Sequence, residues 1–240
     1  EGFVTNRIKD CILTEENLQE LVKLTNEELA QTCTEEKERL KDETCTLLTR
    51  IGALRFGTFT LTGGRLSPYY VDLRILPSFP EAFKTVENIF KSLAENEIGQ
   101  DRFDRIAGIP TAGIPFASVL AYLLHKPFLY VRKEVKTHGR ERRVEGILYP
   151  GEKVLLVDDL VTSGGSLLNA TDAIVAEGGT VEDTLVLIDR EEGGREALQH
   201  RKISLSRLLK MSEVAQVLYD KDVITKDQMT SILRQIRKRY

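Results

Sequence analysis

The sequence has 240 residues, of which 41% are hydrophobic and 30% are charged, proportions that suit a globular domain with short additions. The formal net charge is only −3, so the chain as a whole lacks the excess of positive charge that is typical of nucleic-acid-binding proteins. No apolar run approaches the roughly 18 residues needed to cross a bilayer. We therefore expect a protein that binds neither nucleic acid nor membrane.

Cys11, Cys33 and Cys45 all lie in the first fifth of the chain. Their odd number and the absence of a CxxC spacing argue against disulfides and against a zinc site, and favour free thiols in a reducing compartment. The cysteines therefore predict a cytoplasmic protein.

Residues 14–51 are polar, charged and helix-favouring, with an amphipathic stripe that includes Leu18, Leu21 and Leu48. Thr25 to Glu28 has the form of a capping box that begins a second helix. We expect a small helical lead-in over residues 1–53, which caps the rest of the protein rather than forming a separate domain.

The stretch "FGTFTLTGGRLSPYYVDL", residues 56–73, is rich in β-branched and aromatic residues around Gly63-Gly64 and predicts a β-hairpin. Helical and strand patterns then alternate. Helices are expected over residues 80–97, 114–124 and 167–177, and strands over residues 105–109, 128–131, 154–157 and 181–188. The alternation indicates βαβ units and a mainly parallel sheet with helices on both faces.

In such sheets ligands bind at the carboxyl ends of the strands. The loops after residues 109, 157 and 188 are expected to meet at that edge. After residue 201 the chain is expected to become helical again, in "SLSRLLKMSEVAQVLYD" and "TKDQMTSILRQIRKRY".

The stretch "VLLVDDLVTSGGS", residues 154–166, places two adjacent aspartates between a buried strand and a Gly-rich turn. The backbone N–H groups of Thr162 to Ser166, together with the start of the following helix, suit a phosphate monoester. The Lys-containing phosphate-binding loop of P-loop nucleoside triphosphatases is absent. An ordinary helix cap with two solvated aspartates is the alternative. Asp158 and Asp159 argue against it, because two acceptors side by side could hold vicinal ribose hydroxyls.

This stretch resembles the 5-phosphoribosyl-1-pyrophosphate (PRPP) binding motif of type I phosphoribosyltransferases. The resemblance implies an α/β fold with a mainly parallel twisted sheet flanked by helices, an N-terminal hood and C-terminal helices. It also implies Mg²⁺, held with PRPP near Asp158 and Asp159 without a dedicated set of protein ligands. In this segment the implied PRPP contacts are Asp158, Asp159, Leu160, Val161, Thr162, Ser163, Gly164, Gly165 and Ser166.

The stretch "VRKEVKTHGRERRVEG", residues 131–146, is dense in basic residues. A solvated surface loop is the simpler interpretation, but "RKEVKTHG" is similar to the R-K-E-x-K-x-H-G catalytic loop of orotate phosphoribosyltransferases. By this resemblance Arg132, Lys133, Lys136 and His138 bind PRPP and neutralise the departing pyrophosphate. In the family this loop reaches into the neighbouring subunit's site, which implies a homodimer.

The hairpin stretch resembles the family's "F-x-L-K-S-G-R-x-S-P-Y-F" segment, which contacts orotate. Tyr69 and Tyr70 would then flank the pyrimidine, although one of them could equally belong to an aromatic pair in the core. Thr62 stands where many members carry Lys. Thr162 is also expected near orotate.

Two further segments match the family. "GIPTAG" occupies the pyrophosphate-loop position, where the backbone N–H groups of Thr111, Ala112 and Gly113 could bind pyrophosphate, with Ala112 at a position where some members place Lys. "IDREEGG" places Arg190 where the family recognises the orotate carboxylate, a role that bidentate pairing supports. An ion pair between Arg190 and Glu191 or Glu192 is the alternative.

The resemblance implies transfer of phosphoribosyl from PRPP to N1 of orotate, giving orotidine 5′-monophosphate and pyrophosphate in de novo pyrimidine biosynthesis. It covers residues 54–195, so we divide the chain into a lead-in or hood (1–53), a phosphoribosyltransferase core (54–200) and a C-terminal helical extension (201–240). No decarboxylase domain follows in this sequence, so the monofunctional transferase is expected. A PRPP-sensing regulator on the same fold and a transferase for another base are the alternatives.

Overall fold

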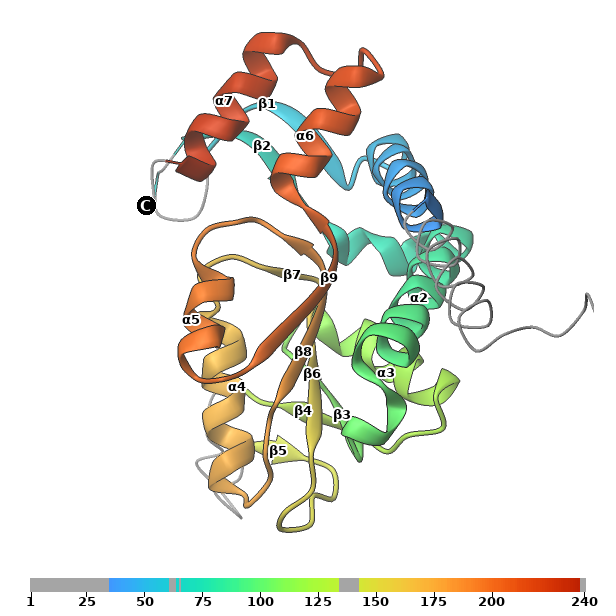
Figure 1. Cartoon of the computed structure of the whole chain (residues 1–240), viewed down its shortest axis with the longest axis vertical. Coiled ribbons are helices and arrows are strands. Elements are labelled where there is room, and N and C mark those ends of the chain that lie inside the picture. The colour runs from blue at the N-terminus through green and yellow to red at the C-terminus, as the bar shows by residue number, and fades with distance from the viewer. Residues whose placement is uncertain (1–34, 61–63, 65, 134–142, 238–240) are drawn as a thin grey trace, which may run out of the picture. The chain divides into compact units, whose positions relative to one another are not determined.

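The computed structural model (Figure 1) describes residues 35–60, 64, 66–133 and 143–237. The chain divides into two compact units, residues 1–43 and residues 44–240. In the first unit the described residues, 35–43, are helical. The predicted helices before residue 35, with the capping box at Thr25, lie outside the described residues. The strands described next and the residues of the main cavity all belong to the second unit.

The second unit begins with helical residues 44–50 and continues into the predicted hairpin. Strands β1 (Leu54–Thr60) and β2 (Leu66–Val71) pair antiparallel, with Leu54 opposite Val71. A short 3-10 helix, η2 (Leu73–Ser78), follows directly. The hairpin prediction is confirmed.

The main sheet has seven strands in the order β5-β4-β3-β6-β8-β7, with β9 paired to β8. The pairs are parallel except β4 with β5, which is antiparallel. The mainly parallel sheet predicted from the alternating pattern is therefore confirmed. The strands are β3 (Arg105–Gly108), β4 (Phe128–Val131), β5 (Val144–Glu145), β6 (Val154–Val157), β7 (Leu160–Val161), β8 (Asp183–Asp189) and β9 (Ser204–Lys210).

Helices cover both faces of this sheet: α2 and α3 lie on one side, and α4 and α5 on the other (Figure 1). They are α2 (Pro80–Leu93), α3 (Gly113–Leu123), α4 (Gly165–Ala176) and α5 (Gly194–His200). A π-helical turn, Ala94–Ile98, and a 3-10 turn, Gln100–Arg102, connect α2 to β3. The chain then ends in α6 (Met211–Asp220) and α7 (Lys226–Arg237).

The hydrophobic core explains why the strand sequences are so uniformly apolar. Every residue of β6 and of β8 is buried, as expected for parallel strands that are covered on both faces. Leu156 and Val186 are fully buried and pack with Ile174 of α4 in one cluster. This core holds the carboxyl ends of β3, β6 and β8 rigidly at one edge.

One predicted helix was wrong. Residues 204–210 were expected to be helical but form β9, which pairs with β8 from Ser204 opposite Asp183 to Lys210 opposite Asp189. The flank of β8 offers a row of backbone groups that need partners, and this tertiary pairing outweighs the helix propensity of the Leu- and Lys-containing segment. The helical prediction holds from Met211 onward.

None of the helices in the described part of the chain is both long enough and apolar enough to cross a membrane.

Candidate active site

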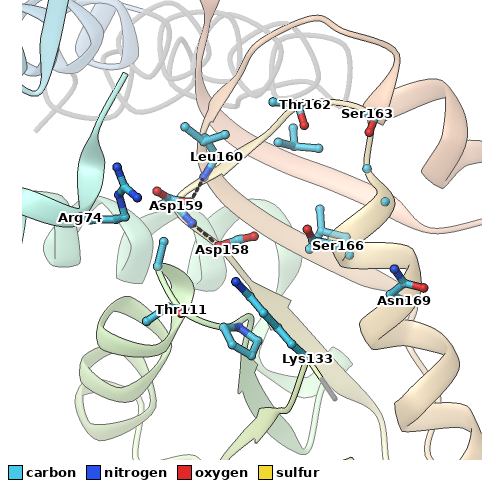
Figure 2. Close-up of a pocket in the computed structure, with 16 residues that line it drawn as sticks. Arg74, Thr111, Lys133, Asp158, Asp159, Leu160, Thr162, Ser163, Ser166 and Asn169 are labelled. Atoms are coloured by element: carbon cyan, nitrogen blue, oxygen red, sulfur yellow. Dashed lines mark hydrogen bonds between the residues drawn. The ribbon is translucent and has the colours of Figure 1, made fainter. Parts of the chain in front are cut away.

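A cavity of about 570 Å³ opens at the carboxyl edge of the sheet, where the loops after β3 and β6 meet (Figure 2). This is the edge at which the sequence predicts a ligand site. The residues that line it are Arg74, Pro110, Thr111, Ala112, Lys133, Asp158, Asp159, Leu160, Val161, Thr162, Ser163, Gly164, Gly165, Ser166, Leu167 and Asn169.

The acidic doublet lies at the end of β6 and is nearly buried, with 7% of Asp158 and 8% of Asp159 exposed. The backbone N–H of Asp159 donates to Asp158 Oδ1 over 2.9 Å, and the N–H of Leu160 donates to Asp159 Oδ1 over 2.8 Å. Burial raises the pKa of both carboxyls, and the charge of Asp159 raises that of Asp158 further. The doublet is therefore a site that favours cations and hydroxyl donors.

The turn that follows the doublet leads into α4. Gly164 adopts a left-handed conformation with φ 80°, and the helix begins at the next residue. Backbone N–H groups at a helix start form an anion site. Gly194 packs against this turn so closely that a Cβ there would lie 2.6 Å from the Thr162 carbonyl oxygen. Gly194, the second glycine of "IDREEGG", thus supports the turn, a role that its sequence pattern did not predict.

The loop after β3 brings Thr111 and Ala112 to the cavity. Gly113 does not line it: its N–H donates to the Ile109 carbonyl oxygen over 2.9 Å, as part of the start of α3. A Cβ at Gly113 would lie 2.5 Å from the Val157 carbonyl oxygen. Gly113 therefore sets the close approach of α3 to the end of β6, and its N–H is already used.

Two basic residues from the end of β4, Arg132 and Lys133, line neighbouring cavities. Lys133 lines the main cavity, whereas Arg132 lines an adjoining cavity of about 250 Å³ and pairs with Glu145 at 2.6 Å. Both cavities share Pro110, Lys133, Ser166 and Asn169. Lys136, His138 and Thr62 lie outside the described residues.

Tyr69 and Arg190 form a separate buried cluster. The Arg190 guanidinium lies over the Tyr69 ring, 5.0 Å from its centroid, and its Nε and Nη2 each lie 3.3 Å from the Tyr69 hydroxyl, to which they donate. Arg190 also pairs with Glu192 at 2.9 Å, so the ion pair considered from the sequence is present. Burial raises the pKa of Tyr69, against the opposing effect of the Arg190 charge.

Tyr70 points to the other face of β2, because successive side chains on a strand alternate. Its ring contacts Phe59, with centroids 5.7 Å apart, and lies beneath the Arg55 guanidinium at 5.1 Å. Its hydroxyl accepts a hydrogen bond from Arg74 Nη2 over 3.1 Å. Tyr69 is the core aromatic of the pair, with 1% exposed, and neither tyrosine lines the main cavity.

Sequence reasoning missed four of the cavity residues: Arg74, Pro110, Leu167 and Asn169. Asn169 lies one turn after Gly165 on α4, so helical periodicity could have placed it on the same face. Arg74 directly follows the hairpin stretch in the sequence, but no spacing rule links it to the acidic doublet.

A family model described as the phosphoribosyl transferase domain matches residues 76–222. The orotate phosphoribosyltransferase of Cenarchaeum symbiosum is 42% identical over 181 residues, which are 75% of this chain and 90% of the relative. The crystal structure of orotate phosphoribosyltransferase from Aeropyrum pernix matches with a TM-score of 0.66 and 31% identity, over 75% of this chain and 99% of that one.

The structure of Leishmania donovani UMP synthase matches with a TM-score of 0.72 and 27% identity. The match covers 82% of this chain but only 42% of that longer protein. Because the family model spans more than half of the sequence and a 42% identical relative is covered almost completely, the chain belongs to the phosphoribosyltransferase family and, within it, to the orotate phosphoribosyltransferases.

Proposed function

We propose that this chain transfers the phosphoribosyl group of PRPP to N1 of orotate, giving orotidine 5′-monophosphate and pyrophosphate in de novo pyrimidine biosynthesis. Membership of the orotate phosphoribosyltransferase family supports the choice of substrates. The observation that carries the proposal is the presence, in one cavity, of a nearly buried acidic doublet and the Gly-rich turn at the start of α4.

The proposed orientation of PRPP places its 5′-phosphate at the Gly-rich turn and its pyrophosphate at the opposite end of the cavity. The turn from Thr162 to Ser166 offers backbone N–H groups and hydroxyls to the 5′-phosphate. Asp158 and Asp159 offer acceptors to the ribose O2 and O3 hydroxyls. The pyrophosphate then lies toward Thr111, Ala112 and Lys133, which line the same cavity. Leu160, Val161, Gly164 and Gly165 complete the proposed contacts along the turn.

The reaction needs no nucleophile from the protein. The bond from ribose C1′ to the pyrophosphate oxygen breaks, pyrophosphate leaves with the electron pair, and orotate N1 forms the new bond as its proton is released. The developing positive charge at C1′ and the negative charge on pyrophosphate are stabilised by positioned charges. Lys133 faces the site of that negative charge, and Arg132, Lys136 and His138 are predicted to join it.

Orotate is proposed to bind near Tyr69, Tyr70, Thr62 and Thr162, with Arg190 pairing with its carboxylate. The contacts of Arg190 support this role in part, because Tyr69 and Glu192 hold the guanidinium in a fixed orientation at the end of β8. A guanidinium has five donors in a planar fork, so these contacts leave donors for a second carboxylate.

Magnesium is proposed to bind together with PRPP, near Asp158 and Asp159 and without a dedicated set of protein ligands. Carboxylate oxygens are the ligands that Mg²⁺ prefers, and the raised pKa of both carboxyls indicates a position where added positive charge is favourable. When bound, the ion would neutralise charge on the pyrophosphate oxygens.

A homodimer with shared active sites, a cytoplasmic location and the absence of nucleic-acid and membrane partners stay predictions from the sequence and the family resemblance.

One assay tests the proposed reaction against both alternatives. Orotate, uracil and adenine are each supplied with PRPP and Mg²⁺, and pyrophosphate release is measured. We expect release with orotate only. Release with another base instead would make the chain a different phosphoribosyltransferase. No release with any base, combined with salt-dependent binding to duplex DNA, would identify the PRPP-sensing regulator.

A further inference from the structure

Arg74 lines the main cavity but is not among the residues proposed to bind PRPP or orotate. It lies in the 3-10 helix η2, immediately after the hairpin strand β2. Figure 2 shows its side chain beside Asp159, whereas Lys133 lies beside Asp158. These two residues are the cationic side chains among the described residues that line the cavity.

The Arg74 guanidinium is held by two neighbours. Nε donates to Asp72 Oδ1 over 2.6 Å, and Nη2 donates to the Tyr70 hydroxyl over 3.1 Å. The hydrogen bond to Asp72 raises the pKa of Arg74 and lowers that of Asp72, so the pair favours the charged form of both groups. The second amino group, Nη1, makes no hydrogen bond with any residue that the structure describes.

Arg74 and Lys133 act on different halves of the acidic doublet. The charge of Arg74 lowers the pKa of Asp159, and the charge of Lys133 lowers that of Asp158. The side chain of Arg74 is nevertheless 59% exposed. It therefore borders the doublet from the solvent side, where an incoming ligand would reach its unused donors.

We propose that Arg74 binds the pyrophosphate group of PRPP, and the pyrophosphate product, through its Nη1 amino group. This inference rests on the proposed function, because it assumes that PRPP occupies the cavity. Pyrophosphate is the most highly charged part of the ligand, and it must lie close to two carboxylates that repel it. The 5′-phosphate has the turn at the start of α4 for its partners, so the cation beside Asp159 is left for the other end of PRPP.

The charge geometry also explains why Asp72 and Tyr70 hold this arginine. A guanidinium fixed before binding loses little conformational freedom when it binds a phosphate oxygen. In this account Asp72 and Tyr70 are positioning residues. A simpler role for Arg74, neutralising Asp159 without touching the ligand, would affect every ligand of the cavity alike.

The test compares two probes, each of which corresponds to one end of PRPP: ribose 5-phosphate to the ribose end and pyrophosphate to the other. Pyrophosphate and ribose 5-phosphate are each titrated into the full chain by calorimetry in Mg²⁺ buffer. For Arg74→Ala we expect pyrophosphate to bind about tenfold more weakly, the loss typical of one charged hydrogen bond, while ribose 5-phosphate binds as it does to the wild type. The KM for PRPP should rise, and the KM for orotate should not change.

Arg55→Ala is the matched control, because Arg55 also contacts the Tyr70 ring but does not line the cavity. It should leave the affinity for both probes unchanged. Equal losses for both probes in Arg74→Ala, or no loss for pyrophosphate, would overturn the proposal. A wild-type chain that bound neither probe would instead contradict the proposed function itself.

Discussion

Four of the eight buried charged residues in the described part of the chain lie at the carboxyl edge of the sheet. Asp158, Asp159, Asp189 and Glu192 are each less than a tenth exposed. Asp189 has a partner in Arg207 at 3.6 Å, and Glu192 has one in Arg190. The doublet has only nearby cations and backbone donors, which leaves burial as the largest influence on both pKa values. Burying these two carboxyl groups at the binding site therefore lowers the stability of the folded protein.

Asp158→Asn tests that loss of stability. The folded-state pKa of Asp158 lies above the unfolded value, so its contribution to stability is present at low pH and is lost as pH rises through the folded pKa. The amide oxygen can still accept the hydrogen bond from the Asp159 N–H. Urea denaturation at about pH 8 should show the variant to be more stable than the wild type by about 0.5–2 kcal/mol, with much weaker binding of PRPP.

The control for this prediction is Asp172→Asn. Asp172 pairs with Arg201 on the surface, with 56% of its side chain exposed, and such pairs contribute about 0–1 kcal/mol. A loss of stability in Asp158→Asn at high pH, equal to or greater than that of the control, would show that the Asp158 charge is not under strain.

Tyr69→Phe separates the ring of Tyr69 from its hydroxyl. The phenyl ring keeps the stacking contact with Arg190, but the hydroxyl that accepts hydrogen bonds from Arg190 is lost. We expect the KM for orotate to rise by about three- to tenfold, as for a neutral hydrogen bond of about 1 kcal/mol, with the KM for PRPP unchanged. Tyr70→Phe is the comparison, and parallel effects of the two variants on both substrates would contradict a specific link between Tyr69 and orotate.

At the level of elements, helix α2 contains a buried carboxyl group that has no hydrogen-bond partner among the described residues. Glu87 is 2% exposed, and neither of its carboxyl oxygens has a hydrogen-bond partner among the described residues. It lies among the buried residues of the helix with Val86 and Phe90. Burial alone raises its pKa from 4.5 to about 9, so the side chain is a neutral carboxylic acid at neutral pH.

Replacing Glu87 with methionine should stabilise the protein and flatten its pH dependence. Because folding raises the pKa of Glu87 from 4.5 to about 9, the wild type loses stability as the pH rises from about 4.5 toward about 9. Between about pH 5 and about pH 8 that loss should exceed the loss in Glu87→Met by about 2–4 kcal/mol. Urea unfolding at both pH values measures it.

Glu81→Gln, an exposed position in the first turn of the same helix, is the matched control and should change neither quantity. If Glu87→Met lost stability with pH as steeply as the wild type does, the carboxyl of Glu87 would have to be ionised at neutral pH, contrary to its burial.

Elements with local sequence patterns could be predicted, and elements defined by pairing could not. The strands at residues 128–131 and 154–157 lie where their apolar runs predict them. Strand β9 exists because β8 needs a partner, which no local pattern of "SLSRLLK" reveals. The cavity shows the same division: the doublet and its turn are contiguous in sequence, whereas Arg74 reaches Asp159 only through the fold.

At the scale of the whole second unit, segments from the beginning and the end of that unit pack together at the carboxyl edge of the sheet. The hairpin strand β2 contacts α7, and α6 contacts β9 (Figure 1). The Ser212 N–H at the start of α6 donates to Glu191 over 2.7 Å, next to Arg190. The hairpin that supplies Tyr69 and the loop that supplies Arg190 are therefore both supported by the C-terminal helices.

The predicted homodimer with shared sites makes a sharp prediction at the same scale. Asp158 lines the cavity of its own chain, whereas Lys136, which lies outside the described residues, is predicted to act in the neighbouring subunit's site. We expect Lys136→Ala to lower kcat far more than it weakens PRPP binding, because its charge acts on the departing pyrophosphate. Each variant alone, Asp158→Asn or Lys136→Ala, should then have little activity.

Mixed dimers of these two variants distinguish shared sites from separate ones. If the basic loop crosses between subunits, one of the two cavities of a mixed dimer has both Asp158 and Lys136 intact, so purified mixed dimers should have about half of wild-type activity. The two chains, with different affinity tags, are co-expressed, and the doubly tagged dimers are purified and assayed. Doubly tagged dimers that are no more active than the separate variants would show that each chain completes its own site, and the failure to recover any doubly tagged dimer from soluble co-expressed chains would contradict the dimer itself.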